Sequence, residues 1–135
     1  MTLYINCCVR EESRTDRLAR AVLQKLGGNF TEIKLYEENL KPLNRGTLNK
    51  RTALIEQGDY SDPMFDYAKQ FAGADTIVIA APYWDLSFPA QLKTYIENIY
   101  VILCQQCAYL SDNAHAVLAD NGNYSIHCFY SFFIL

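Results

Sequence analysis

Apolar positions along this 135-residue chain change spacing repeatedly, and the changes predict a succession of strands and helices. Leu3 to Cys8 is a short apolar run, which is typical of a strand. Ser13 to Leu26 follows with apolar residues three and four positions apart, which predicts a helix ended by Gly27 and Gly28. The expected apolar face of that helix comprises Leu18, Ala19, Val22, Leu23 and Leu26.

The same alternation continues along the chain. Phe30 to Tyr36 predicts a second strand, and Thr47 to Gln57 and Pro63 to Ala72 predict two helical segments. Thr76 to Ala80 is apolar and rich in β-branched residues, as expected of a strand covered on both faces. Alternating strands and helices favour one α/β domain, with a parallel sheet and helices on both of its faces.

The segment that follows Thr76 to Ala80 carries the most specific pattern of the chain. Pro82 ends the strand because proline has no N–H for the ladder, and Pro89 fits the first turn of a helix that continues to Tyr100. Ligands of open α/β sheets bind at the carboxyl ends of strands, so a flat, partly apolar ring would suit this place. The alternative is that the side chains merely close the core beneath a loop. Those side chains are Tyr83, Trp84, Leu86 and Phe88.

The turn after the first strand is the second candidate site. Ser13 is placed as the N-cap of the following helix, with Asp16 as its capping-box partner. Unpaired N–H groups, the helix dipole, the Ser13 and Thr15 hydroxyls and the Arg14 side chain could hold a single phosphate. The alternative is an ordinary capped helix. The chain has no GxGxxG or GxxxxGK[ST] motif, so a dinucleotide-binding turn and a nucleotide-hydrolysing loop are not supported.

Composition and charge narrow the range of partners. Half of the residues are hydrophobic (50%), 20% are charged, and the formal net charge is -3, which argues against nucleic acid or an anionic membrane as partner. No apolar run is long enough to span a bilayer, and Arg10, Glu11 and Glu12 occupy the place of a signal peptide's apolar core. We therefore expect a cytoplasmic protein that binds small molecules.

The five cysteines form an odd set, for which reduced thiols are the expected state. Cys104 and Cys107 have the CxxC spacing of metal and redox sites. A structural zinc ion needs about four ligands, and only His115, His127 and Cys128 could complete the set. Free thiols are the alternative, and we predict no metal site.

Taken together, Ser13 to Leu18 and Ala81 to Lys93 resemble the flavodoxin-like NAD(P)H dehydrogenases, a group that includes quinone reductases and FMN-dependent azoreductases. The second motif is the more specific, because its prolines, its aromatic pair and its Gln-Leu-Lys helix start match in order and spacing. The resemblance covers Met1 to Val101, about three quarters of the chain.

The resemblance implies a flavodoxin-like three-layer fold and an FMN cofactor, with FAD as the alternative. The FMN phosphate would lie among Ser13, Arg14 and Thr15. The isoalloxazine ring would lie against Pro82, Tyr83, Trp84, Asp85 and Leu86, with backbone amides of the Trp84 to Leu86 region as donors.

The family chemistry implied is two-electron transfer in ping-pong fashion. NAD(P)H would give hydride to the flavin and leave, and a quinone or azo acceptor would take its place. The flavin carries the chemistry, so no catalytic side chain is expected. The family also implies a homodimer with the flavin near the subunit interface.

From Ile102 onward the family likeness stops, so residues 102–135 are expected to form a tail outside the family. Tyr124 to Leu135 is an apolar, aromatic run that could supply a fourth strand, with no fifth, which would leave the fold incomplete at its C-terminal strands. Loss of the pattern at Tyr100 to Cys104 indicates a prematurely ended or frame-shifted sequence, and a divergent tail is the alternative. The function is therefore either an FMN-dependent oxidoreductase or an inactive flavodoxin-like fragment or interaction module.

Overall fold

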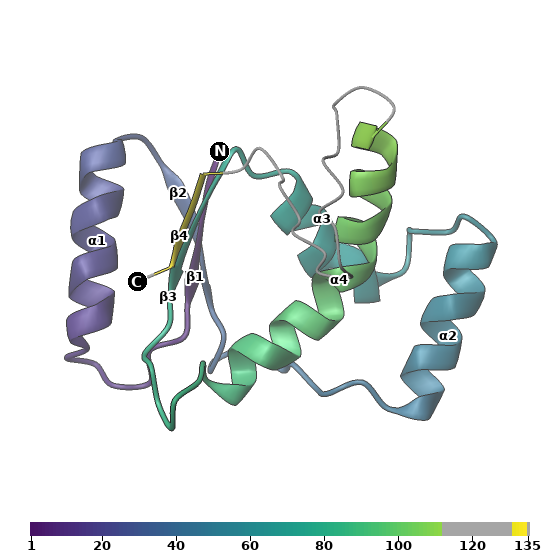
Figure 1. Ribbon diagram of the computed structural model, residues 1–135, viewed down its shortest axis with the longest axis horizontal. Helices are drawn as coiled ribbons and strands as arrows, with labels where there is room; N and C mark the ends of the chain where they lie inside the picture. The colour runs from purple at the N-terminus through teal and green to yellow at the C-terminus, as the bar shows by residue number, and fades with distance from the viewer. Residues whose placement is uncertain (112–130, 135) are drawn as a thin grey trace, which may run out of the picture.

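The computed structural model describes the backbone of residues 1–111 and 131–134 and the side chains of residues 1–100. Strands and helices alternate in it as the sequence predicts (Figure 1). The elements are β1 (Thr2–Asn6), α1 (Arg14–Leu26), β2 (Phe30–Lys34), α2 (Arg45–Glu56), the 3₁₀ turn η1 (Pro63–Phe65), α3 (Asp66–Ala72), β3 (Thr76–Ala80), α4 (Ala90–Ser111) and β4 (Ser131–Ile134).

The strands form one parallel sheet in the order β2-β1-β3-β4. Thr2 of β1 is aligned with Phe30 of β2 on one side and with Thr76 of β3 on the other. The chain passes from β1 to β2 in one direction and then returns to add β3 on the opposite side of β1. The order of the strands therefore reverses between β1 and β3, the kind of position at which open α/β sheets bind ligands.

Helices cover both faces of the sheet, which confirms the α/β fold class and gives three layers (Figure 1). Alternate residues of β3 serve the two faces, as the two-residue period of a strand requires. Val78 and Ala80 pack with Ala19 and Leu23 of α1. Ile77 and Ile79 belong to the larger core on the other face, with side chains of α3 and α4.

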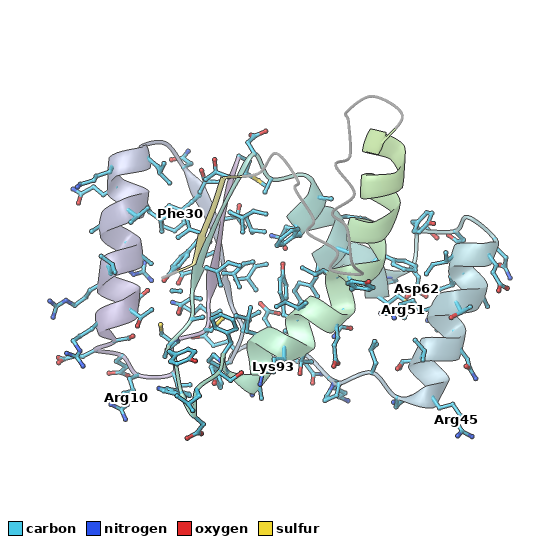
Figure 2. All side chains as sticks on the ribbon, in the orientation of Figure 1. Arg10, Phe30, Arg45, Arg51, Asp62 and Lys93 are labelled. Atoms are coloured by element: carbon cyan, nitrogen blue, oxygen red, sulfur yellow. The ribbon has the colours of Figure 1, made fainter. Side chains whose placement is uncertain are left out.

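Helix α2 lies outside these layers and has no buried residue (Figure 1). Polar contacts attach it to its neighbours: Lys50 pairs with Asp62 at 2.6 Å, and Arg51 donates to the carbonyl oxygen of Glu97 on α4 at 2.9 Å. Arg51 and Asp62 lie between α2 and α4 in Figure 2. An ion pair and a hydrogen bond of its side chains thus connect α2 to the rest of the domain.

The face that α1 turns to the sheet agrees with the expected one at Ala19 and Leu23, which are buried, and differs at its edges. Leu18 and Leu26 are 54% and 45% exposed, although both were placed on the apolar face. Asp16 lies on the same side of α1 as Ala19 and Leu23, and its carboxylate is bonded to side chains of β1. The buried face of the helix is therefore narrower than the hydrophobic pattern predicts, and it continues into a polar contact at the first turn.

Helix α4 also differs from its expected bounds. It begins at Ala90, and Pro89 stands just before it, where its carbonyl oxygen accepts the N–H groups of Leu92 and Lys93. The helix continues to Ser111, so loss of the family pattern after Tyr100 does not interrupt it. In the described part of the chain, no helix is both long and apolar enough to cross a membrane.

The C-terminal expectation is met in its described part. Strand β4 pairs in parallel with β3, with Thr76 aligned to Ser131, so part of the run from Tyr124 to Leu135 does occupy the fourth strand position. The rest of that run lies outside the described residues. So do the side chains of the CxxC pair and its possible zinc partners, namely Cys104, Cys107, His115, His127 and Cys128.

Candidate functional site

The two candidate loops start side by side at one edge of the sheet. Asn6 at the end of β1 is aligned with Ala80 at the end of β3, and the Cys7 N–H donates to the Ala80 carbonyl oxygen at 2.9 Å. Figure 2 labels Arg10 on the loop after β1 and Lys93 in the first turn of α4, both toward this edge. The chain thus brings segments 7–13 and 81–89 together where the strand order reverses.

The first of these loops ends in the N-terminus of α1. Ser13 is the N-cap, as expected: its hydroxyl oxygen accepts the Asp16 N–H at 3.3 Å, and its carbonyl oxygen accepts the Arg17 N–H at 3.1 Å. The N–H groups of Arg14 and Thr15 have no acceptor among residues 1–111 and 131–134. They are unpaired first-turn donors, which with the positive end of the helix dipole suit an anion.

The predicted role of Asp16 as a capping-box partner is wrong, because its carboxylate faces the sheet. Its Oδ1 accepts from the Tyr4 hydroxyl at 2.5 Å and from the Asn6 amide at 3.2 Å, while its Oδ2 accepts from Arg20 Nε at 2.9 Å. Burial and this hydrogen bond to Asp16 raise the pKa of Tyr4 well above its usual value. The negative charge is therefore directed away from the free N–H groups of the first turn.

The second loop contains a tight hairpin that the sequence analysis did not foresee. Trp84 and Ser87 exchange two backbone hydrogen bonds, of 2.9 and 2.8 Å. Asp85 and Leu86 between them have φ angles of 48° and 59°, as in a type I′ turn. A leucine in this left-handed region is strained, and such strain gathers at binding sites.

This hairpin reduces the number of backbone N–H groups in the Trp84 to Leu86 region that could donate to a ligand. The Trp84 N–H is used by Ser87, so it is not available to a ligand. The N–H groups of Asp85 and Leu86 have no acceptor within the described part of the chain. Of the region from Trp84 to Leu86, two amides are therefore placed to donate.

The apolar side chains of the second loop do not close the core. The exposed fractions are 66% for Tyr83, 41% for Trp84 and 87% for Leu86. These values exclude the alternative that the side chains only close the core beneath a loop. Phe88, 39% exposed, meets the Tyr83 ring edge to face, with centroids 6.3 Å apart. Exposed apolar groups gathered at the carboxyl edge of the sheet are typical of a contact surface for another molecule.

Comparison with known proteins agrees with this geometry. The family model described as "Flavodoxin-like fold" matches residues 1–104. The chain belongs to this family. The match confirms the resemblance that the two motifs indicate over Met1 to Val101.

Named relatives and a solved structure extend the comparison. An FMN-dependent NADH:quinone oxidoreductase of Clostridium perfringens (strain SM101) is 36% identical over 106 residues, which are 73% of this chain and 54% of the relative. An FMN-dependent NADH:quinone oxidoreductase 2 of Clostridium acetobutylicum is 37% identical over 107 residues, which are 73% of this chain and 52% of the relative. An azoreductase structure from Bacillus anthracis str. Sterne is 25% identical, with a TM-score of 0.60 over 73% of this chain and 54% of that one. The chain thus spans about half the length of the curated relatives it matches.

One residue of this flavodoxin-like domain that the sequence analysis passed over is Asn6. It lies at the end of β1 and bonds Cys8, Asp16 and Glu32 through its side chain. The available signal was a polar residue inside the apolar run from Leu3 to Cys8. Its partners are 10 and 26 residues away for Asp16 and Glu32, so the spacing of the sequence did not reveal them.

Burial favours the neutral thiol form of the two cysteines that follow β1. Burial raises the pKa of Cys7 to about 12, and burial also raises the pKa of Cys8. Within the described residues, no group of three or more His, Cys, Asp or Glu side chains is placed to hold a metal ion. A shallow hollow lined by Arg20, Leu23, Gln24, Gly27, Gly28 and Phe30 lies toward the other end of α1 and is separate from the two loops.

Proposed function

We propose that residues 1–101 form the FMN-binding region of an FMN-dependent NAD(P)H oxidoreductase that reduces quinone- or azo-type acceptors. The observation that carries the proposal is the pair of adjacent loops, one with free helix-terminal N–H groups and one with exposed aromatic side chains. The relatives named FMN-dependent NADH:quinone oxidoreductase support FMN as cofactor and NADH as donor. Residues 102–135 would be a tail that adds the fourth strand.

The phosphate of FMN would be held by Ser13, Arg14 and Thr15. The free N–H groups of Arg14 and Thr15 are suited to phosphate oxygens, and the helix dipole favours negative charge at this point. The exposed Arg14 side chain adds a cation, and the Ser13 and Thr15 hydroxyls add donors. Because the Asp16 carboxylate is turned to the sheet, it does not oppose the phosphate.

The isoalloxazine ring would lie against Pro82, Tyr83, Trp84, Asp85 and Leu86. The side chains of Tyr83 and Trp84 offer flat apolar surface, and the N–H groups of Asp85 and Leu86 can donate to the polar edge of the ring. The type I′ turn holds these two amides in one fixed arrangement. A rigid turn loses little conformational entropy when it binds a ligand.

Bound FMN would supply the two-electron chemistry, accepting hydride from NAD(P)H and passing it to the acceptor. The residues of this chain bind and orient the ring, and the exposed loop leaves one face for donor and acceptor in turn, as ping-pong exchange needs. Neither buried Cys7 nor the half-buried Cys8 thiol is set up to react, because the pKa of each is raised. The proposed mechanism therefore requires no catalytic side chain of the protein.

We also propose a cytoplasmic homodimer. Like the second loop, α4 carries an exposed apolar side chain, Ile96, which is 43% exposed. Apolar surface of this sort favours association with a second subunit. The odd number of cysteines favours a reducing compartment, and the net charge of -3 gives no reason to expect a nucleic-acid or anionic-membrane partner.

The test is to add FMN or FAD to the purified chain, desalt it, and record flavin absorbance and NAD(P)H consumption with a quinone or an azo dye. Retained yellow colour with turnover supports the enzyme. Retained flavin without turnover would support the alternative of a non-catalytic flavodoxin-like module. A colourless chain that consumes no NAD(P)H would refute the proposal.

A further inference from the structure

Asn6 is almost wholly buried, with 7% exposed, and its amide oxygen and both amide N–H donors have hydrogen-bond partners. Its Oδ1 accepts the Cys8 N–H at 2.9 Å. Its Nδ2 donates to Asp16 Oδ1 at 3.2 Å and to Glu32 Oε1 at 2.9 Å. A donor on one side and two carboxylates on the other determine which way round the amide lies.

These three bonds attach both ends of the loop 7–13 to a single side chain. Cys8 lies where the loop leaves β1, and Asp16 lies in the first turn of α1, just after the N-cap Ser13. The main chain of Asn6 is fixed as well, because its carbonyl oxygen accepts the Leu35 N–H at 2.9 Å. Asn6 therefore links the central strand of the sheet to the helix turn that carries the free N–H groups.

The charges around Asn6 explain why an amide is needed there. Arg20 bridges Asp16 and Glu32 with two bonds of 2.9 Å, so the cluster holds two carboxylates and one guanidinium. The neutral donors of Asn6 and Tyr4 supply further hydrogen bonds to the Asp16 carboxylate. With the Asn6 donor removed, that carboxylate is freer to turn to the N-terminus of α1, where a capping-box acid bonds and where a phosphate would meet its charge.

We propose that Asn6 is the positioning residue of the phosphate-binding turn: it fixes the first turn of α1 against β1 and keeps the Asp16 carboxylate out of the phosphate position. The inference rests on the proposed function, because the ligand concerned is the phosphate of FMN. Asn6 itself would not touch the flavin. It would act through the placement of the Arg14 and Thr15 amides.

The test compares FMN with riboflavin, which has the same ring and no phosphate. Dissociation constants for both are measured by flavin fluorescence in the full chain and in Asn6→Ala. We expect the FMN-to-riboflavin affinity ratio to fall roughly tenfold in the variant, while riboflavin affinity changes little. A variant that merely lowers the folded fraction would weaken both ligands equally and leave the ratio unchanged.

The matched control is Asn44→Ala. Asn44 caps α2, and its side chain accepts the Thr47 N–H at 3.0 Å, so the control also removes an asparagine hydrogen bond next to a helix start. It lies away from both loops, and its affinity ratio should equal that of the wild-type chain. The second test variant, Asn6→Asp, keeps the shape and an acceptor for Cys8 but adds a third carboxylate, and should lower the ratio further.

The outcomes separate this inference from the proposed function. If the wild-type chain binds FMN and Asn6→Ala keeps the wild-type ratio, the positioning role is wrong and the proposed function stands. If the wild-type chain binds no FMN, both are wrong. If Asn6→Ala does not fold, Asn6→Asp decides by the same ratio, and failure of both variants to fold would make Asn6 a structural residue and overturn the assignment.

Discussion

Replacing Leu86 with glycine should stabilise the protein, although glycine substitutions usually destabilise. The φ angle of Leu86 is 59°, in the left-handed region that costs an L-residue roughly 1–2 kcal/mol and costs glycine nothing. Two terms oppose this gain. Glycine adds about 0.4–1 kcal/mol of unfolded-state entropy, and the lost side chain is already 87% exposed, so about 0.3 kcal/mol of burial is forfeited. The expected net gain in the free energy of unfolding is about 0.5 kcal/mol.

The measurement is urea unfolding of the full chain and of Leu86→Gly, with the slope of the transition compared to ensure that only stability has changed. Val9→Gly is the matched control, because Val9 is also an apolar loop residue, 52% exposed, and its φ is not positive. The control should lose about 0.5–1 kcal/mol. Equal losses in both variants would show that Leu86 carries no backbone strain and that the type I′ turn is wrong.

Three further predictions concern the Ser13 cap, the Trp84 ring and the partly buried Tyr67 hydroxyl. Ser13→Ala should lower the free energy of unfolding by about 1 kcal/mol in a thermal melt and weaken FMN binding. Trp84→Ala should lower the free energy of unfolding by about 1–2 kcal/mol, because more than half of a ring that is 41% exposed is still buried, and should weaken FMN by about tenfold in a fluorescence titration. Burial and the hydrogen bond to Glu38 raise the pKa of Tyr67 from 10.0 to about 12 in the folded state, so the unfolded state loses its proton first. Stability should fall as the pH rises above 10, and fall less in Tyr67→Phe in urea titrations at several pH values.

Each of these has an outcome that contradicts it. A Ser13→Ala variant of unchanged melting temperature would mean that the hydroxyl does not cap α1. Unchanged FMN affinity in Trp84→Ala would remove this ring from the site. Identical alkaline stability curves for the wild-type chain and Tyr67→Phe would mean that the hydroxyl is not held in its neutral form by the fold. Thr15→Ser, which keeps a hydroxyl in the same turn, serves as the control for the Ser13 experiment.

Local patterns predicted the order of the elements well, and contacts between distant residues account for most of the differences. The strand Thr76–Ala80 lies where the apolar run predicts it, because burial on both faces leaves a continuous signal. The buried centre of α1, Ala19 and Leu23, was predicted, whereas the bond between Asp16 and Tyr4 was not, because it joins two different elements. The first turn of α1 contains one feature of each kind. The cap at Ser13 depends on neighbouring residues and was predicted, whereas the direction of the Asp16 side chain depends on its bonds to β1 and was not.

The hairpin of the second loop could not be predicted for a different reason. Type I′ turns are recognised by Asn-Gly or Asp-Gly, and this chain has Asp85 followed by leucine. The exposed aromatic side chains were recognised as candidates from their place after a strand, but sequence alone left open whether they were core. Their exposure in the fold settled that question, because Tyr83 and Leu86 are 66% and 87% exposed and side chains that close a core are mostly buried.

The outer position of α2 makes it a place where the protein can be altered without disturbing the two loops. A helix with no buried residue contributes little to the cooperative unit formed by the sheet and its covering helices, so its amides should exchange with solvent well before those of β1 and β3. Insertions and labels are best tolerated where little packed surface is lost. A fluorescent probe at exposed Asn49, for example, would report on flavin binding by energy transfer while leaving the carboxyl edge of the sheet as it is.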